Sequence, residues 1–321
     1  MAACVLRYPR RPTMDIPTLP AWAWIPITLS AALAQTIRNA AQRSLVSQAG
    51  TLAATLARFL YGLPFALVFV AVAQQLSGRP VPAFHAGYFG WVAMGAVAQL
   101  LATACLLKAM QQRNFIVGVA FSKTEVLQVA LFSTFFLHEV PTWLAALAML
   151  AATLGVVLLS LPARAGAAGG VAAGGASQAV LYGIASGACF ALSAVGFRGA
   201  ALAMPDVAPW LLGGWGVLWA QLLQSLLLGG WLAARDPVAL ATTARVWRVS
   251  ILAGAMGALA STGWFTAMAI QPAADVRTLG LVEVFFSLLV SRRIFREKLR
   301  AGERWGLALV LLGLVGICLQ L

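Results

Sequence analysis

Long apolar runs follow one another along almost the whole chain, and short polar segments separate them. Each run has about 20 residues, which is the length that an α-helix needs to cross the hydrocarbon core of a bilayer. The pattern predicts an all-α integral membrane protein with ten transmembrane helices. We place these spans at residues 22–46, 51–74, 89–107, 115–137, 143–161, 179–203, 210–233, 249–269, 276–295 and 305–319.

A segment rich in glycine and alanine, residues 162–178, separates the fifth span from the sixth. Its composition is typical of a flexible connection between two structural units. The chain therefore divides into a first five-helix repeat at 21–161 and a second five-helix repeat at 179–321. The prolines and arginines of residues 1–20 predict a disordered basic tail ahead of the first repeat.

Two glutamates recur at the same separation in the two halves. A shift of 158 residues places Glu125 on Glu283 and Glu139 on Glu297. Charged residues rarely coincide by chance inside apolar helices, so the match indicates that one helix is used twice. Because five is an odd number, the second repeat would enter the membrane in the opposite orientation. Inverted repeats of this kind surround the central site of many secondary transporters.

Polar residues are concentrated on one face of the first predicted span. Gln35, Arg38, Asn39 and Gln42 lie within roughly 100° of one another on a helix of 3.6 residues per turn. The second span carries a basic residue, Arg58, inside its apolar run. We interpret Arg38 and Arg58 as residues that face a buried aqueous cavity. The alternative is that their side chains extend from the helix ends to the membrane surface.

The fourth predicted span carries an acid near its middle. Glu125 lies about eleven residues into the run, where insertion of an ionised group costs roughly 2.5–3.5 kcal/mol. Gln128 shares its face, whereas Lys123 lies about 200° away round the helix, so Lys123 and Glu125 are not expected to pair. We expect Arg38 or Arg58 to be the partner of Glu125. A structural salt bridge is the alternative to a titrating or substrate-binding acid.

Composition excludes several classes of function. Hydrophobic residues make up 61% of the chain and charged residues 10%, against about a quarter in soluble proteins. The net charge of +13 fits basic residues in the loops of a membrane protein better than nucleic-acid binding. Four scattered cysteines and two histidines give no metal-ligand spacing and no His-based catalytic group. We therefore expect no metal, no cofactor and no enzymatic activity.

Two helix endings, FFLHEVPT and RIFREKLR, are each followed by a short uncharged span that contains Gly155 or Gly313. With the ten spans in two fives, they resemble the paired EamA domains of the drug/metabolite transporter superfamily. The resemblance extends over residues 22–319, and it departs from the usual leucine–glycine–glutamate ending at His138 and Arg296. It implies a carrier of the bacterial inner membrane that moves small metabolites by alternating access, often outward, with both termini in the cytoplasm.

The resulting hypothesis is a secondary active transporter that exports a small polar metabolite with an anionic group, such as an amino acid. Candidate cations outnumber the two acids of the predicted cavity, which favours an anion. The expected partners are this substrate, the lipid bilayer and a coupled proton, in a monomer or a homodimer. The candidate substrate-binding residues are Arg38, Asn39, Gln42, Arg58, Lys123, Gln128 and Arg277. The candidate proton-coupling residues are Glu125 and Glu283, since buried acids form the proton relays of many transporters.

Three other functions stay open at this point. A cationic-drug/proton antiporter would need an unpaired acid in an aromatic cavity, to which Trp215, Trp219 and Trp264 could contribute. A lipid-linked sugar flippase would need a lateral opening, and a sensor or scaffold would need no central charge. Orientation is also contested, because basic residues after the ninth span favour the reverse of the orientation that the resemblance implies.

Overall fold

The computed structural model describes residues 19–111, 121–160, 173–286 and 301–320. Within these ranges the secondary structure is helical throughout and includes no strand. The helices are η1 (Ala21–Ala23), α1 (Trp24–Leu60), α2 (Leu63–Ser77), α3 (Ala86–Gln111), α5 (Glu125–Leu137), α6 (Trp143–Ser160), α7 (Ala173–Leu202), α8 (Pro209–Arg235), α9 (Pro237–Arg245), α10 (Trp247–Ile270), α11 (Ala273–Leu279), η2 (Gly280–Val282) and α13 (Ala301–Cys318).

Five helical stretches are long and apolar enough to cross a membrane. They are Ala21–Ser77, Ala86–Ala109, Gln178–Leu202, Pro209–Arg235 and Trp247–Ile270. Shorter apolar helices add Glu125–Leu137, Trp143–Leu159 and Arg304–Cys318. The predicted all-helical membrane protein is confirmed at this level, and every predicted span overlaps a described helix. Parts of the fourth and ninth spans, the basic tail up to residue 18 and most of the predicted linker lie outside the described residues.

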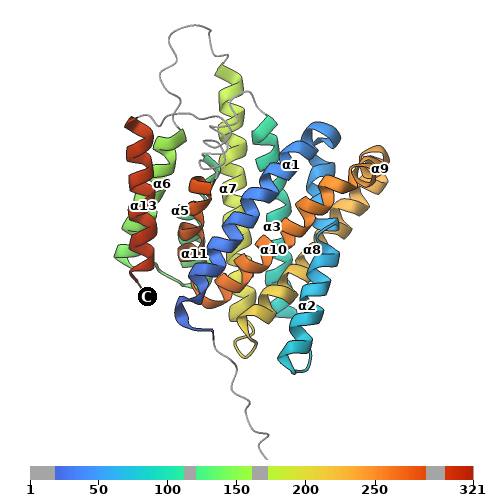
Figure 1. The fold of residues 1–321 in the computed structure, drawn as a ribbon, viewed down its shortest axis with the longest axis horizontal. Helices are drawn as coiled ribbons and strands as arrows, with labels where there is room; N and C mark the ends of the chain where they lie inside the picture. Colours follow the sequence, from blue (N-terminus) through green and yellow to red (C-terminus); the bar gives the residue numbers. More distant parts are fainter. Residues whose placement is uncertain (1–18, 112–120, 161–172, 287–300, 321) are drawn as a thin grey trace, which may run out of the picture.

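The first two predicted spans belong to one long element with a sharp turn inside it. Gly50 interrupts α1 with φ 80° and ψ 174°, a backbone conformation that glycine adopts without the steric penalty of a side chain. Figure 1 shows α1 crossing the bundle diagonally and then reversing toward α2. A second interruption at Tyr61 and Gly62 precedes α2, which has Pro64 in its first turn. The reversal brings Arg58 back beside the first part of α1.

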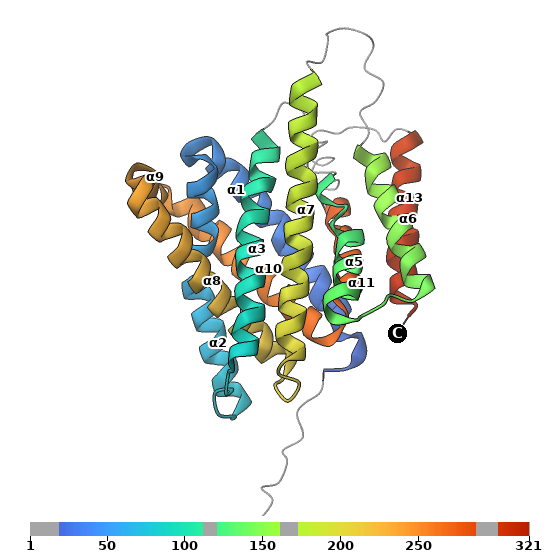
Figure 2. The same cartoon turned by 180° about the vertical axis from the view of Figure 1, so that it is seen from behind.

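Successive elements run up and down the bundle. The start of α1 and the end of α13 both lie at the lower end in Figure 1. Figure 2, which shows the bundle from behind, has α3 and α7 side by side. Helix α1 packs along α10 over a similarly long interface. The short helix α9, which the sequence did not predict, lies at the upper end beside the tops of α8 and α10.

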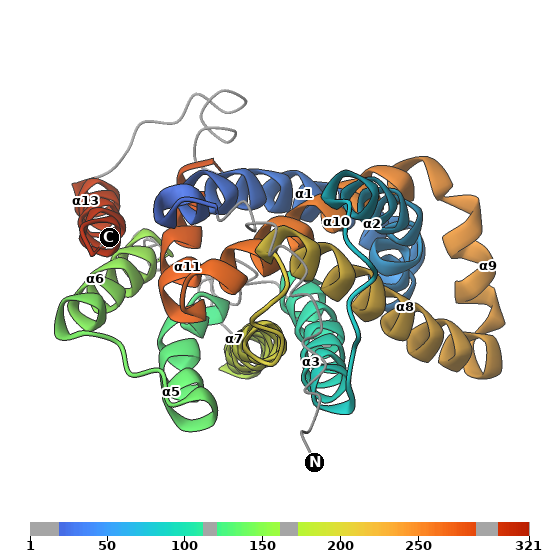
Figure 3. The ribbon, with the colours of Figure 1, turned by 90° about the horizontal axis from the view of Figure 1, so that it is seen from below.

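Two predominantly apolar helices, α6 and α13, pack against each other at one edge of the bundle (Figure 3). Their backbones approach closely because Gly155 meets Gly306, and Gly313 meets Ala152. Their outer faces expose large apolar side chains such as Leu154. The two helices occupy a peripheral position in the bundle.

Candidate functional site

The glutamates that recur in the two halves both stand just after an interruption of a helix. A turn at Lys123 and Thr124 precedes α5, which begins at Glu125. In the second half, the 3₁₀ turn η2 precedes a new helical stretch that begins at Glu283. The prediction of an unbroken fourth helix through Glu125 is therefore wrong. Broken helices place polar groups at the centre of many transporters.

Each of these glutamates forms an ion pair with a cation from the other half of the chain. Glu125 accepts hydrogen bonds from the guanidinium of Arg277, and Lys123 pairs with Glu283. Glu125 and Glu283 are only 4% and 6% exposed. The two halves are thus joined by two crossed, buried ion pairs. As predicted, Lys123 and Glu125 do not pair with each other.

The prediction that Arg38 or Arg58 would pair with Glu125 is wrong. The reason lies in the packing of the helices: α5 lies directly against α11, which carries Arg277. Arg38 and Arg58 instead pack against α10, where their stems meet Gly257. It is Glu283, the copy of Glu125 in the second half, that contacts the polar face of α1.

Trp264 of α10 connects the two ion pairs through its ring. Its Nε1 donates a hydrogen bond to Gln35 Oε1 at 3.1 Å, and Gln35 Nε2 donates to Glu283 Oε2 at 2.7 Å. The guanidinium of Arg277 lies 4.6 Å from the centroid of the same ring, in a cation–π contact. Gly280 makes room for the ring, because a Cβ there would lie 2.5 Å from Trp264 Cη2. Side chains of α1, α5, α10 and α11 thereby form one connected network.

Arg58 and Arg38 are buried cations without a carboxylate partner in the described part of the chain. Each is 2% exposed. Arg58 Nη1 donates to Thr103 Oγ1 at 2.6 Å, but its Nε has no hydrogen-bond partner. Arg38 donates to Asn39 Oδ1 at 2.8 Å. Burying a charge without an opposite charge is costly, so this pair of guanidinium groups is suited to bind an anion.

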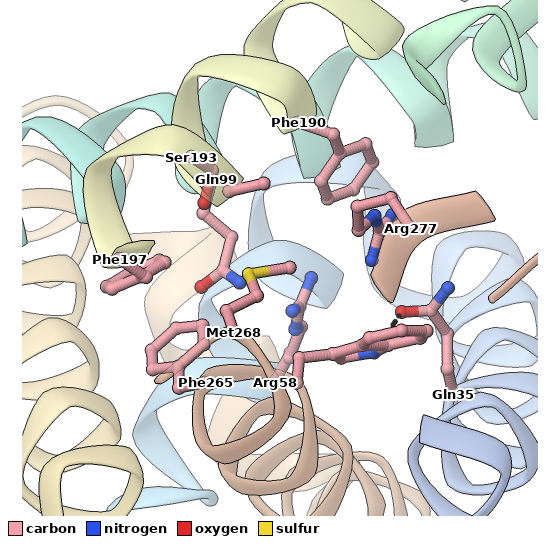
Figure 4. Close-up of a pocket in the computed structure, with 11 residues that line it drawn as sticks. Gln35, Arg58, Gln99, Phe190, Ser193, Phe197, Phe265, Met268 and Arg277 are labelled. Carbon is pink, nitrogen blue, oxygen red and sulfur yellow. Dashed lines mark hydrogen bonds between the residues drawn. The ribbon is translucent and has the colours of Figure 1, made fainter. Parts of the chain in front are cut away.

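A small cavity of about 20 Å³ lies at this point of the bundle. In Figure 4, Arg58 projects into it, with Arg277 and Gln35 on one side and Phe197 and Phe265 on the other. A smaller adjoining cavity shares Gln35, Trp264 and Arg277 with it and is lined by both ion pairs. The lining residues of the larger cavity, which we call the central cavity, are Gln35, Arg58, Gln99, Phe190, Ser193, Ala194, Phe197, Trp264, Phe265, Met268 and Arg277.

Five of the nine predicted site residues line these two cavities. They are Arg58, Lys123, Glu125, Arg277 and Glu283. The sequence did not single out Gln99 or Ser193 as binding residues. It named Trp264 only for the drug-antiporter alternative, and it treated Gln35 only as part of a polar stripe. Gln99 had one visible signal, a lone amide inside an apolar span.

The other four predicted residues do not line the two cavities. Arg38 and Asn39 bond to each other behind Arg58. Gln42 donates to the carbonyl of Ala54 at 3.3 Å and so ties the two arms of the Gly50 turn together. Gln128 donates to Thr124 Oγ1 beside the start of α5. In this conformation the side chains of all four residues form hydrogen bonds within the protein.

A third ion pair joins the two halves near the lower end of the bundle in Figure 1. Arg198 of α7 donates from Nε to Glu139 Oε1 at 2.9 Å, and its Nη1 donates to the carbonyl of Met268 at 2.8 Å. The sequence marked Glu139 only as one of the repeated glutamates and did not single out Arg198. Its equivalent in the second half, Glu297, lies outside the described residues. In the described ranges, no group of three His, Cys, Asp or Glu side chains is placed to hold a metal ion.

The fold and the site define a multi-pass helical membrane protein with an enclosed, charged cavity between its two halves. Residues 22–161 match the model of the EamA-like transporter family, which is part of the drug/metabolite transporter superfamily. One solved crystal structure is similar to this chain, with a TM-score of 0.66. The alignment covers 93% of this chain and 97% of the chain in that structure. At 17% identity, this similarity shows a shared fold. No curated protein matches the sequence.

Proposed function

We propose that the protein is a secondary active transporter that moves a small organic anion, such as an amino acid, by alternating access. The observation that carries this proposal is Arg58. It is buried, projects into the central cavity, has a free Nε and has no carboxylate partner among the described residues. A carboxylate can accept two parallel hydrogen bonds from a guanidinium group, which makes it the natural counter-ion.

The cavity wall suggests an anion with an apolar body. Phe190, Phe197, Phe265 and Met268 line the cavity together with Arg58. An apolar side chain of the substrate could contact these residues while its carboxylate meets the guanidinium. A highly charged sugar phosphate would leave most of its polar groups without partners on such a wall.

Alternating access is supported by the way in which the two halves pack. Exchanging the halves converts the α1–α10 contact into the α7–α3 contact, and these are the two most extensive helix pairs. The pairs α6–α13 and α2–α8 are each converted into themselves. This pattern is the one expected of ten helices in two inverted five-helix repeats. We infer that the halves rock about the central cavity.

Proton coupling is assigned to Glu125 and Glu283. Each carboxylate holds a cation of the opposite half, so protonation would release one of the contacts that join the halves. A substrate carboxylate could then take over the released cation, which links the two binding events.

Replacement of Glu125 by glutamine tests this coupling. The amide cannot take up a proton, so transport into reconstituted vesicles should lose its dependence on pH. The matched control is Glu139→Gln, which alters the ion pair with Arg198 away from the central cavity and should leave the pH profile in place. A profile that survives Glu125→Gln unchanged would remove Glu125 from the coupling mechanism.

The competing functions fit the site less well. A cationic-drug antiporter needs an unpaired acid, but both acids of the central network are paired with cations. Trp215 and Trp219 stack on each other in a separate aromatic cluster with Phe84. Members of the EamA-like family are generally transporters and not enzymes. A flippase would respond to lipid-linked sugars, and a sensor would bind its ligand without moving it.

Uptake by the purified protein in proteoliposomes tests the proposed function. We expect saturable uptake of amino acids or aromatic carboxylates, and none of the corresponding amines. Binding without uptake would indicate a sensor, and uptake of cations alone would favour the drug antiporter.

We place the protein in a bacterial inner membrane with both chain ends in the cytoplasm, as the resemblance implies, and we propose that transport runs outward. Three exposed arginines in and beside α9, Arg235, Arg245 and Arg248, lie at the opposite end of the bundle, and the charge rule alone would reverse the orientation. Labelling of a cysteine placed at Val81, in the loop between α2 and α3, decides the matter. Labelling from the outer face of intact cells would contradict the proposed orientation.

A further inference from the structure

Three cavities follow one another from the protein surface to the central cavity. An open hollow at the lower end of α7 and α10 is lined by Arg198, Leu202 and Ala269, among others. A small cavity shares Ala201 and Leu212 with this hollow. The same small cavity shares Phe197 and Phe265 with the central cavity. The shared walls place the three cavities in a row, and a pair of phenylalanine rings stands between the last two.

The two rings extend from helix to helix between these cavities. Phe197 of α7 and Phe265 of α10 stack with centroids 3.5 Å apart and planes inclined by 24°. Behind Phe197 lies Gly95 of α3, where a Cβ would come within 3.1 Å of the ring. Behind Phe265 lies Gly216 of α8, where a Cβ would come within 3.3 Å. The stack therefore fills the space between α3 and α8, and both glycines provide room for it.

A polar group and an ion pair accompany the rings. The hydroxyl of Tyr88 lines the small cavity, is buried and has no hydrogen-bond partner. Arg198 follows Phe197 in α7 and bonds to Glu139 and to the carbonyls of Met268 and Ala269. Because Met268 is three residues after Phe265, these bonds fasten α7 to α10 beside the stack.

We propose that the Phe197–Phe265 stack is the gate between the central cavity and the lower end of the bundle. The proposal rests on the proposed transport function and adds the route and the residues that close it. Opening would separate α7 from α10 at this end and part the rings, while Tyr88 offers a hydrogen bond to the passing anion. At the positions equivalent by the 158-residue shift stand Asn39 and Leu107, so the aromatic pair belongs to one end of the molecule.

Cysteine accessibility tests the gate without any substrate. In a background without the natural cysteines, Leu202→Cys reports the hollow and Ser193→Cys reports the central cavity. A charged, impermeant thiol reagent is applied to membrane vesicles from the side on which Leu202→Cys reacts. We expect Ser193→Cys to react at least tenfold more slowly than Leu202→Cys. Replacing both rings with alanine should remove most of this difference.

The control for ring removal is Phe190→Ala, which deletes an aromatic ring of the same cavity outside the stack. It should leave the labelling of Ser193→Cys slow. If an alanine variant fails to fold, Phe197→Leu and Phe265→Leu replace the alanine substitutions. Unchanged labelling of Leu202→Cys then shows that the variant protein is folded.

The gate is overturned if Ser193→Cys reacts as fast as Leu202→Cys with both rings present. It is also overturned if ring removal changes nothing, or if Phe190→Ala has the same effect. Failure of the proposed transport function has a different signature. In that case Ser193→Cys would still become accessible on ring removal, but no anion would be taken up by proteoliposomes.

Discussion

Replacing Arg58 with glutamine should abolish anion binding and, at the same time, stabilise the empty protein. Loss of one member of a buried charged contact costs about 2–5 kcal/mol of binding free energy, equivalent to roughly 30-fold to several thousand-fold in Kd. In the empty protein, however, the guanidinium is buried with a free Nε and no carboxylate partner in the described residues. Removing that charge should raise the melting temperature by about 2–4 °C.

Melting curves with and without a carboxylate ligand measure both effects at once. Arg245→Gln is the matched control, because Arg245 is exposed at the end of α9 and should leave binding unchanged. Arg58→Lys keeps the charge but loses the two-pronged geometry, and an intermediate affinity is expected. An Arg58→Gln protein that binds the anion as tightly as the wild type would contradict the assignment of the site.

The ion pair between Lys123 and Glu283 should show a strong energetic coupling in a double-mutant cycle. Either Lys123→Met or Glu283→Gln alone leaves a buried charge without its partner and should cost about 3–5 kcal/mol of stability. The double variant removes both charges, so it should recover most of that loss. Because the pair joins the two halves, the double variant should nevertheless transport poorly.

Urea or thermal unfolding of the four proteins, followed by transport assays, completes the cycle. The matched cycle is Arg198→Met with Glu139→Gln, a pair that also joins the halves but lies outside the central cavity. It should show coupling in stability with a smaller effect on substrate affinity. Additive losses at Lys123 and Glu283 would show that the two side chains do not interact in the folded protein.

The helices and the repeated glutamates could be predicted because their signals are local. Twenty apolar residues in a row indicate a membrane helix wherever they occur, and a charge inside such a run is expensive enough to be informative. Glu125 and Glu283 stood out for this reason. The sequence also predicted that Lys123 and Glu125 do not pair, although the continuous helix on which that prediction rested is broken at Lys123 and Thr124.

The partners in the site could not be predicted, because they depend on which helices become neighbours. Glu125 binds Arg277 rather than Arg38 because α5 packs on α11. The turn at Lys123 and Thr124 has neither glycine nor proline, so nothing in the local sequence marked it. Gln99 and Arg198 each looked like a single polar residue in a long apolar run. Their roles come from residues more than 50 positions away.

The most direct test of the central claim compares carboxylates with their own amides as ligands of the purified wild-type protein. Each pair, such as an amino acid and its carboxamide, keeps the apolar body and removes only the anionic group. A bound ligand at 100 times its Kd stabilises the folded state by about 2.7 kcal/mol. We expect the carboxylates to raise the melting temperature by several degrees and the amides to leave it unchanged. Equal stabilisation by both members of every pair would contradict the proposal that the buried arginines bind the substrate's anionic group.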